Sequence, residues 1–201
     1  MSPKRKSVSI PITQAELLVL VARETARMSY PGSMSRGVNP VVSAGTKTTL
    51  EEYFAGNFDL KNIRNLKTFT QNKYDSWHKT KTGEIARRIQ NLVHQGRNPQ
   101  AVATKFLNTF MHQLMKHEDY RALYPFLHLP LDRRVFDKLR SIRWPSLPKK
   151  FQTFTCSPYS LSYKKYSTIQ TALCALVCDL NKGRPSNLNL RSRIDLNWLW
   201  V

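Results

Sequence analysis

Signals for helix starts, each followed by apolar residues at helical spacing, recur along the chain and constrain its fold more than any other feature. Asn98-Pro99 is typical of a helix start, with a capping side chain and then proline at the first helical position. Val102, Phe106 and Phe110 follow on one helical face. Strand-like alternation is weak throughout, so the sequence predicts an all-α, multi-helix globular fold.

Similar signals predict the remaining helices and the domain organisation. We expect one basic tail over residues 1–12 and one helical domain over 13–201, with two helical lobes flanking a cleft as the open alternative. A loop is expected from Tyr30 to about Ala44, and another over 143–158. The other predicted helices cover 13–28, 48–56, 59–66, 82–95, 162–180 and 193–200, and one more runs to Ile142 from either Pro130 or Asp132.

Net charge is the strongest indication of function. The chain has 32 Lys and Arg against 13 Asp and Glu, a formal charge of +19 in 201 residues. Such a surplus repels itself in the folded state, and a polyanion would neutralise it while releasing counterions. We therefore expect double-stranded DNA as the partner; the plain alternative is a soluble protein that is merely basic.

Several other classes of protein are disfavoured. No apolar run reaches the length of a membrane span, and the basic N-terminus lacks the apolar segment of a signal peptide. Cys156, Cys174 and Cys178 do not have the spacing of a zinc or iron–sulfur site, so no metal and no cofactor is expected. We expect a monomer in the cytoplasm, associated with the nucleoid, or in the nucleus of a eukaryote.

A segment that mixes aromatic and basic residues lies at 71–81. Lys73, Tyr74, Trp77, Lys79 and Lys81 interleave cations with rings in a polar setting, a pattern that suits stacking on bases and binding to phosphates. These five residues are therefore candidates for nucleic-acid binding, and a core position for Trp77 is the open alternative.

Asp132 is the candidate catalytic residue. It follows Leu129-Pro130-Leu131 at a predicted helix N-terminus and precedes Arg133 and Arg134, which are candidate phosphate ligands. The helix dipole and the two arginines should keep its carboxylate ionised. The structural alternative is an N-cap with a local salt bridge.

The stretch His128-Leu-Pro-Leu-Asp-Arg-Arg-Val135 resembles the segment that carries the catalytic aspartate in helix-hairpin-helix DNA glycosylases. Tyr166-Ser-Thr-Ile-Gln170 and Ile194-Asp-Leu-Asn-Trp-Leu-Trp200 resemble the closing helices of members related to the archaeal 8-oxoguanine enzymes. The resemblance covers roughly residues 80–200 at the level of motifs. It implies an all-helical enzyme that flips a base out of the duplex, with Asp132 stabilising the oxocarbenium-like sugar.

One position departs from the family pattern and another agrees with it. The only glycine turn in range, 95–99, holds one glycine and Arg97, so the phosphate-binding hairpin would be degenerate. Lys116 lies 16 residues before Asp132, where the resemblance places the lysine of bifunctional members; a solvated lysine is the alternative.

The sequence thus predicts a DNA glycosylase, monofunctional, that excises a damaged or modified base in repair or in antiviral defence. The alternative is a basic helical protein that binds DNA or RNA without catalysis. A structural protein of a ribonucleoprotein is disfavoured, because its long extensions would lack the regular apolar faces seen here.

Overall fold

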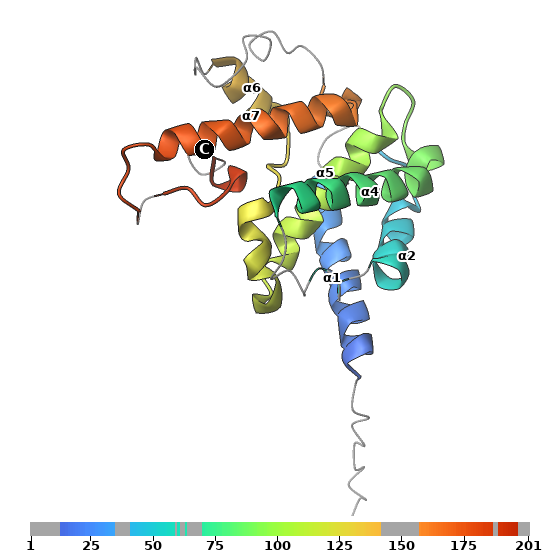
Figure 1. Cartoon of the computed structure of the whole chain (residues 1–201). Helices are drawn as coiled ribbons and strands as arrows, with labels where there is room; N and C mark the ends of the chain where they lie inside the picture. The colour runs from blue at the N-terminus through green and yellow to red at the C-terminus, as the bar shows by residue number, and fades with distance from the viewer. Residues whose placement is uncertain are drawn as a thin grey trace, which may run out of the picture.

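In the computed structural model, the described part of the chain is helical (Figure 1), as predicted. β pairing in this part is limited to an isolated bridge between Val42 and Val93. None of its helices is both long and apolar enough to cross a membrane. The structure describes residues 13–34, 41–58, 60, 63, 70–141, 157–186 and 189–196.

Long α-helices alternate with short 3-10 turns. Asp59 and most of the helix predicted over 59–66 lie outside the described residues, as do the tail 1–12, Cys156 and the end of the predicted 193–200 helix. The elements in chain order are α1 (Gln14–Met34), α2 (Thr46–Asn57), α4 (Gln71–Ile89), η2 (Gln90–Leu92), α5 (Pro99–Leu114), η3 (Glu118–Phe126), α6 (Arg133–Ser141), η5 (Pro158–Ser160), α7 (Tyr163–Asn181) and η7 (Arg193–Asp195).

Capping accounts for three helix starts that the sequence predicted. The Thr13 hydroxyl accepts from the Glu16 N–H, and the Glu16 carboxylate accepts from the Thr13 N–H at 2.8 Å, which is a complete capping box for α1. Asn98 caps α5 through the Gln100 N–H at 2.9 Å, and Ser162 caps α7. α1 then runs six residues beyond its predicted end.

Two predicted helix starts are wrong. α2 begins at Thr46 rather than Thr48, because Gly45 has a φ of 90° and turns the chain in the left-handed region that favours glycine. α4 begins after Thr70, not at Thr82, which is buried in its middle. The first half of α4 escaped detection because its inward positions, Tyr74 and His78, carry polar groups that hide the helical period.

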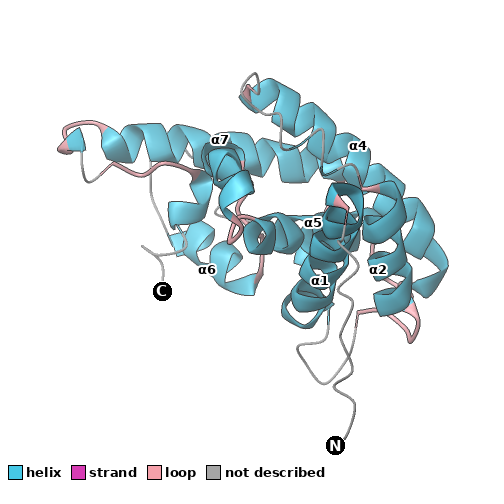
Figure 2. Ribbon diagram, turned by 90° about the horizontal axis from the view of Figure 1, so that it is seen from below, coloured by secondary structure: helices cyan, strands magenta, loops and turns pink. Residues whose placement is uncertain are grey.

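The core has two hydrophobic clusters. The first is built from α1, α2, α4, α5 and η3, with Phe54, Phe106 and Phe110 at its centre. The second joins α6 and α7 to Ala101 of α5 and to Leu131. In Figures 1 and 2, α5 lies among α1, α2 and α4, while α6 and α7 lie together on the other side of the molecule. The polar groups between these clusters form part of the site described next.

Candidate nucleic-acid interface

The exposed residues on the solvent face of α4 include a row of basic and small polar side chains. Lys73, Lys79 and Arg87 are exposed, and exposed Ser76 and Thr80 lie between them on the same face. At 1.5 Å per residue, the distance along the helix from the first cation to the last is about 21 Å. We call this set of five residues the α4 stripe.

Both acidic residues of α4 are half-buried and have partners. Glu84, eleven residues after Lys73, lies on the side of the helix that carries the stripe, and Asp75 lies opposite Glu84. Glu84 accepts from Tyr53 at 2.6 Å and pairs with Lys81 at 2.9 Å. Asp75 accepts from Gln71 at 2.7 Å and contacts a buried histidine. Other side chains therefore hold both carboxylates, and the exposed Lys73, Lys79 and Arg87 give the solvent face of α4 a net positive charge that attracts anions.

The structure divides the five residues predicted to bind nucleic acid on this segment. Lys73 and Lys79 lie on the α4 stripe, but Lys81 lies beside it in its ion pair with Glu84. Tyr74 is 1% exposed, so it cannot stack on a base in this conformation. Trp77 is half-buried, with its ring 5.7 Å from that of Phe58, which is the core position left open by the sequence.

Arg97 and Lys105 converge on one tyrosine. The Arg97 guanidinium lies 5.8 Å from the centre of the Tyr159 ring, and the Lys105 amine lies 4.7 Å from it and also bonds the Tyr159 hydroxyl. Gly96, with a φ of 80°, makes the turn that presents Arg97. The turn at 95–99 therefore exists between η2 and α5, and it displays a guanidinium on its surface.

Asp132 is the N-cap of α6. Its Oδ1 accepts from the Val135 N–H at 3.0 Å, and its carbonyl accepts from the Phe136 N–H at 3.1 Å. Among the described residues the other carboxylate oxygen forms no hydrogen bond. Arg133 and Arg134 are exposed beside it.

Lys116 and Asp132 belong to different elements. Lys116 is exposed just past the end of α5, and no described hydrogen bond or ion pair joins it to Asp132. Its positive charge adds to burial in lowering the pKa of His112. In the structure, therefore, no described hydrogen bond or ion pair joins the two predicted catalytic residues.

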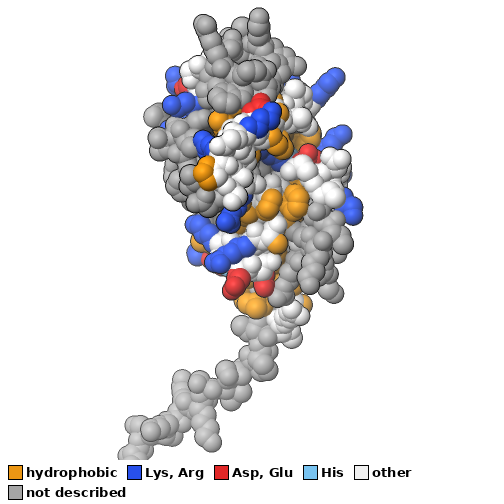
Figure 3. All heavy atoms as spheres, turned by 60° about the vertical axis from the view of Figure 1, so that its left-hand side comes forward, with side chains coloured by type: hydrophobic (Ala, Val, Ile, Leu, Met, Phe, Trp, Pro, Cys, Tyr) orange, Lys and Arg blue, Asp and Glu red, His pale blue; other side chains and the backbone are white. Residues whose placement is uncertain are grey.

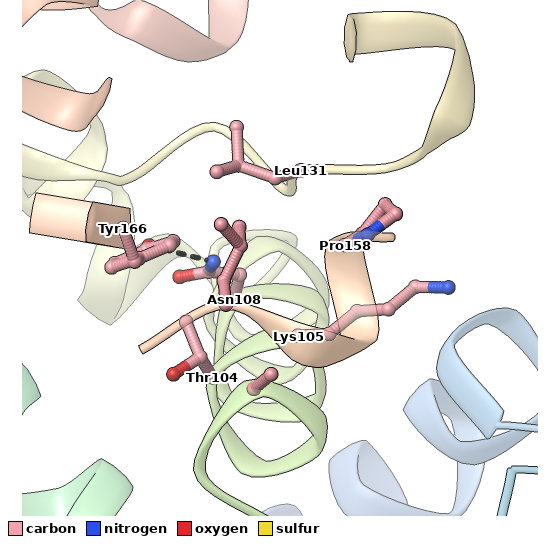
Figure 4. A pocket seen from close by; sticks show the side chains of 8 residues that line it. Thr104, Lys105, Asn108, Leu131, Pro158 and Tyr166 are labelled. Atoms are coloured by element: carbon pink, nitrogen blue, oxygen red, sulfur yellow. Dashed lines mark hydrogen bonds between the residues drawn. The ribbon is translucent and has the colours of Figure 1, made fainter. Parts of the chain in front are cut away.

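A hollow beside Leu131 lies between α5, η5 and α7 (Figure 4). Its volume is about 10 Å³, room for roughly one water molecule. Pockets that enclose organic ligands usually measure about 300 Å³ or more. Figure 4 shows the Lys105 amine pointing away from Asn108 and Tyr166, out of the hollow. The described residues around Leu131 thus form no pocket for a flipped base.

A chain of hydrogen-bonded side chains, here the polar relay, joins α4, α5 and α7 through their buried faces. His128 Nε2 lies 2.7 Å from Asp75 Oδ1, and His128 Nδ1 lies 2.8 Å from the Tyr166 hydroxyl. His128 is buried, while the Asp75 side chain is 37% exposed at the surface end. The members of the relay, in order, are Asp75, His128, Tyr166, Asn108, His78 and Tyr163.

The inner half of the relay continues through α5. Asn108 Nδ2 donates to the Tyr166 hydroxyl at 2.8 Å, and Asn108 Oδ1 lies 2.9 Å from His78 Nε2. His78 Nδ1 lies 3.0 Å from the Tyr163 hydroxyl. Each ring nitrogen of both histidines therefore has a partner, as buried polar groups require.

One charge fixes the direction of every hydrogen bond in the relay. Burial alone would raise the pKa of Asp75, but hydrogen bonds from His128 and Gln71 outweigh it and lower that pKa, so the carboxylate is ionised and accepts. His128 then donates from Nε2 and accepts from Tyr166 at Nδ1. The Asn108 amide donates to Tyr166 and accepts from His78 Nε2, so all donors point toward Asp75.

Burial keeps both histidines neutral. It lowers the pKa of His128 to about 4, even though the hydrogen bond to Asp75 acts to raise it. Burial also lowers the pKa of His78 well below its ordinary value, and the neighbouring His128 acts in the same direction. The relay is thus a network of neutral groups ending at one carboxylate.

The buried Arg193 side chain joins the end of η3 to α7 and approaches α4. Its side chain is 3% exposed, and its guanidinium donates to the carbonyls of Phe126, Leu127 and Gln170. Its Nη2 lies 3.9 Å from Asp75 Oδ1. A buried arginine with carbonyl partners and a nearby carboxylate is a fixed structural cation, not one that is accessible to phosphate.

No family model, curated protein or solved structure matches this chain in comparisons with known proteins. The resemblance to glycosylases therefore depends on the motifs alone. Sequence reasoning missed Arg87, Ser76 and Thr80 of the α4 stripe. Ser76, Thr80 and Arg87 follow Lys73 by 3, 7 and 14 residues, and this helical spacing is the signal that would have found them.

Proposed function

We propose that the protein binds double-stranded DNA through the phosphate backbone, with the α4 stripe as a central contact. The observation that carries this proposal is the row of exposed cations on α4, Lys73, Lys79 and Arg87, on a helix whose two carboxylates are held by other side chains. Lys and Arg donate to phosphates more effectively than neutral groups do, and the hydroxyls of Ser76 and Thr80 add neutral donors.

Duplex DNA suits the stripe better than duplex RNA. The major groove of B-DNA admits an α-helix, whereas the major groove of A-form RNA is too narrow for side chains to read. The stripe is rich in cations and hydroxyls, which favour contacts to phosphates over recognition of base sequence. Lys and Arg side chains spread over a further face of the molecule in Figure 3 support binding at several phosphates.

The test compares two triple variants of equal charge. Lys73→Ala, Lys79→Ala and Arg87→Ala together should reduce the slope of log affinity against log salt by about 2.7, at about 0.9 for each phosphate that is no longer neutralised. The matched control replaces Lys47, Arg140 and Lys182 by alanine, each of which is paired with an acid close by in sequence. Fluorescence anisotropy of labelled duplexes at several salt concentrations measures both slopes.

Equal reductions of the slope in the two triple variants would show that net charge, not the α4 stripe, binds DNA. Tighter binding of single-stranded RNA than of duplex DNA at the same salt would refute the choice of partner. A wild-type affinity independent of salt would refute phosphate binding altogether.

A second candidate function is DNA glycosylase activity, and the position of Asp132 favours it. Its half-exposed carboxylate stands at a helix N-terminus beside Arg133 and Arg134, with one oxygen uncommitted among the described residues. Such a carboxylate could face a phosphate-bound sugar and stabilise developing positive charge.

DNA that carries a panel of damaged and modified bases tests this candidate, with abasic sites revealed by alkali. Asp132→Asn should abolish base release and leave DNA binding intact. Equal activity of the wild type and Asp132→Asn would remove this residue from the mechanism. A borohydride-trapped adduct that disappears in Lys116→Ala would indicate a bifunctional lyase, whereas we expect no adduct.

A further inference from the structure

α6 carries a second basic surface, separate from the α4 stripe. Its inner side is buried in the second hydrophobic cluster through Val135, Phe136 and Leu139. The exposed basic residues of α6 that form no ion pair among the described residues are Arg133, Arg134 and Lys138. We call these three residues the α6 basic face. At 1.5 Å per residue they cover about 8 Å of the helix axis, a length over which duplex DNA carries about four phosphates.

The carboxylates at α6 have partners on the helix itself. Asp132 caps the helix N-terminus by accepting from the Val135 N–H at 3.0 Å. Asp137 lies on the exposed side and pairs with Arg140. With both acids engaged, the cations of the α6 basic face leave this helix with a net positive charge toward solvent, which attracts a polyanion.

The two basic surfaces lie on different sides of α7. α4 turns its buried side toward α7 through His78, whose Nδ1 lies 3.0 Å from the Tyr163 hydroxyl. α6 turns its buried side toward α7 in the second hydrophobic cluster, where Phe136 of α6 and Leu173 of α7 are both buried. Figure 1 shows α7 between α6 above it and α4 below it, and in Figure 2 the two helices are again apart. Their exposed sides therefore point in different directions.

A single duplex reaches both surfaces only if it bends around the molecule. DNA is stiff on this scale, because its persistence length is about 150 base pairs, so such a bend costs free energy. A second duplex on the α6 basic face requires no bend. Two basic surfaces that point in different directions therefore fit two separate duplexes better than they fit one.

We infer that each chain binds two DNA duplexes at once, one on the α4 stripe and one on the α6 basic face, and so joins them. The inference rests on the proposed binding to phosphates and adds to it a second site and the activity of cross-linking DNA. A duplex on each side also neutralises more of the charge of +19, whose repulsion acts on the whole folded chain.

Capture of a fluorescent duplex by protein on a bead-bound duplex tests the inference. Both duplexes are about 12 base pairs long, too short to bend around the molecule. Unbound protein is washed away at about 0.15 M salt, so fluorescence per bound chain reports the second duplex. Arg133→Ala, Arg134→Ala and Lys138→Ala together should weaken binding of that duplex by about a hundredfold, since each lost contact removes about 0.9 from the slope of log affinity against log salt.

Two further variants supply the comparison. The triple variant of the α4 stripe should lose capture to a similar extent, because each chain then retains one surface for one duplex. The matched control replaces Arg27, Lys47 and Lys182 by alanine, which removes the same charge from residues that pair with acids outside α6. The control should capture as much duplex as the wild type. Circular dichroism verifies that each variant is folded.

Three outcomes would overturn the inference. The first is a wild type that binds the bead-bound duplex but captures no second one, which would leave the proposed function standing. The second is capture that persists in the α6 triple variant, since associated chains or another surface would then join the duplexes. The third is an equal loss in the control variant, since net charge alone would then explain capture. Absence of binding to the first duplex would refute the proposed function and the inference together.

Discussion

Lowering the pH from about 7 to about 5 should destabilise the fold, because the polar relay buries two histidines as neutral rings. The pKa of His128 is about 4 in the folded protein, against 6.5 as its ordinary value. Between these values the unfolded chain binds more protons than the folded one, so stability falls as the pH falls. For His128 alone, linkage gives a loss of about 2 kcal/mol at about pH 5.

The other titrating groups act in known directions. Burial lowers the pKa of His78 well below its ordinary value, so His78 should add a loss of stability of the same sign. Burial also lowers the pKa of His112, which should act in the same direction. The lowered pKa of Asp75 contributes stability that is lost only below its ordinary range, so it does not affect the comparison at about pH 5.

Urea unfolding followed by circular dichroism at both pH values measures the loss. The same comparison in His112→Gln removes the contribution of that half-buried ring. Ring-proton NMR adds a direct test, since His128 should not titrate near 6.5 while the protein remains folded. A loss below about 1 kcal/mol in the His112→Gln protein, or a His128 ring that titrates normally, would refute the neutral relay.

Two further substitutions test single interactions. Tyr166→Phe removes the hydroxyl that bonds both His128 and Asn108, so unfolding should become easier by about 1–3 kcal/mol while DNA affinity stays unchanged; an unchanged urea midpoint would contradict the relay. Asp132→Ala should cost about 1 kcal/mol by removing the α6 cap, and Asp132→Asn less, because asparagine caps nearly as well; equal stability of all three proteins would contradict the capping role.

Much of the fold could be predicted because local signals and burial agree. In α5 the Asn98 cap and the apolar period through Phe110 indicate the same helix, and the structure confirms both. α7 follows the same rule from Ser162 onward. α4 shows the limit of this approach, since Tyr74 and His78 face inward although they are not aliphatic.

The relay could not be predicted, because its hydrogen bonds join residues that are distant in sequence. His78 and Tyr163 are 85 residues apart, and Asn108 and Tyr166 are 58 apart. No local spacing encodes such pairs, and each residue has an ordinary alternative as a core or surface side chain. For Asp132 the sequence left the N-cap open as an alternative to catalysis, and the hydrogen bond to the Val135 N–H is the capping interaction.

The relay and the α4 stripe depend on the same feature of α4. A carboxylate on a phosphate-binding helix would repel DNA if it faced the backbone. Asp75 is instead held by His128 and Gln71, and Glu84 by Tyr53 and Lys81. Since both carboxylates are held by these partners, the exposed cations Lys73, Lys79 and Arg87 leave α4 with a net positive charge toward solvent. The buried network thus supports the surface charge pattern as well as the packing between helices.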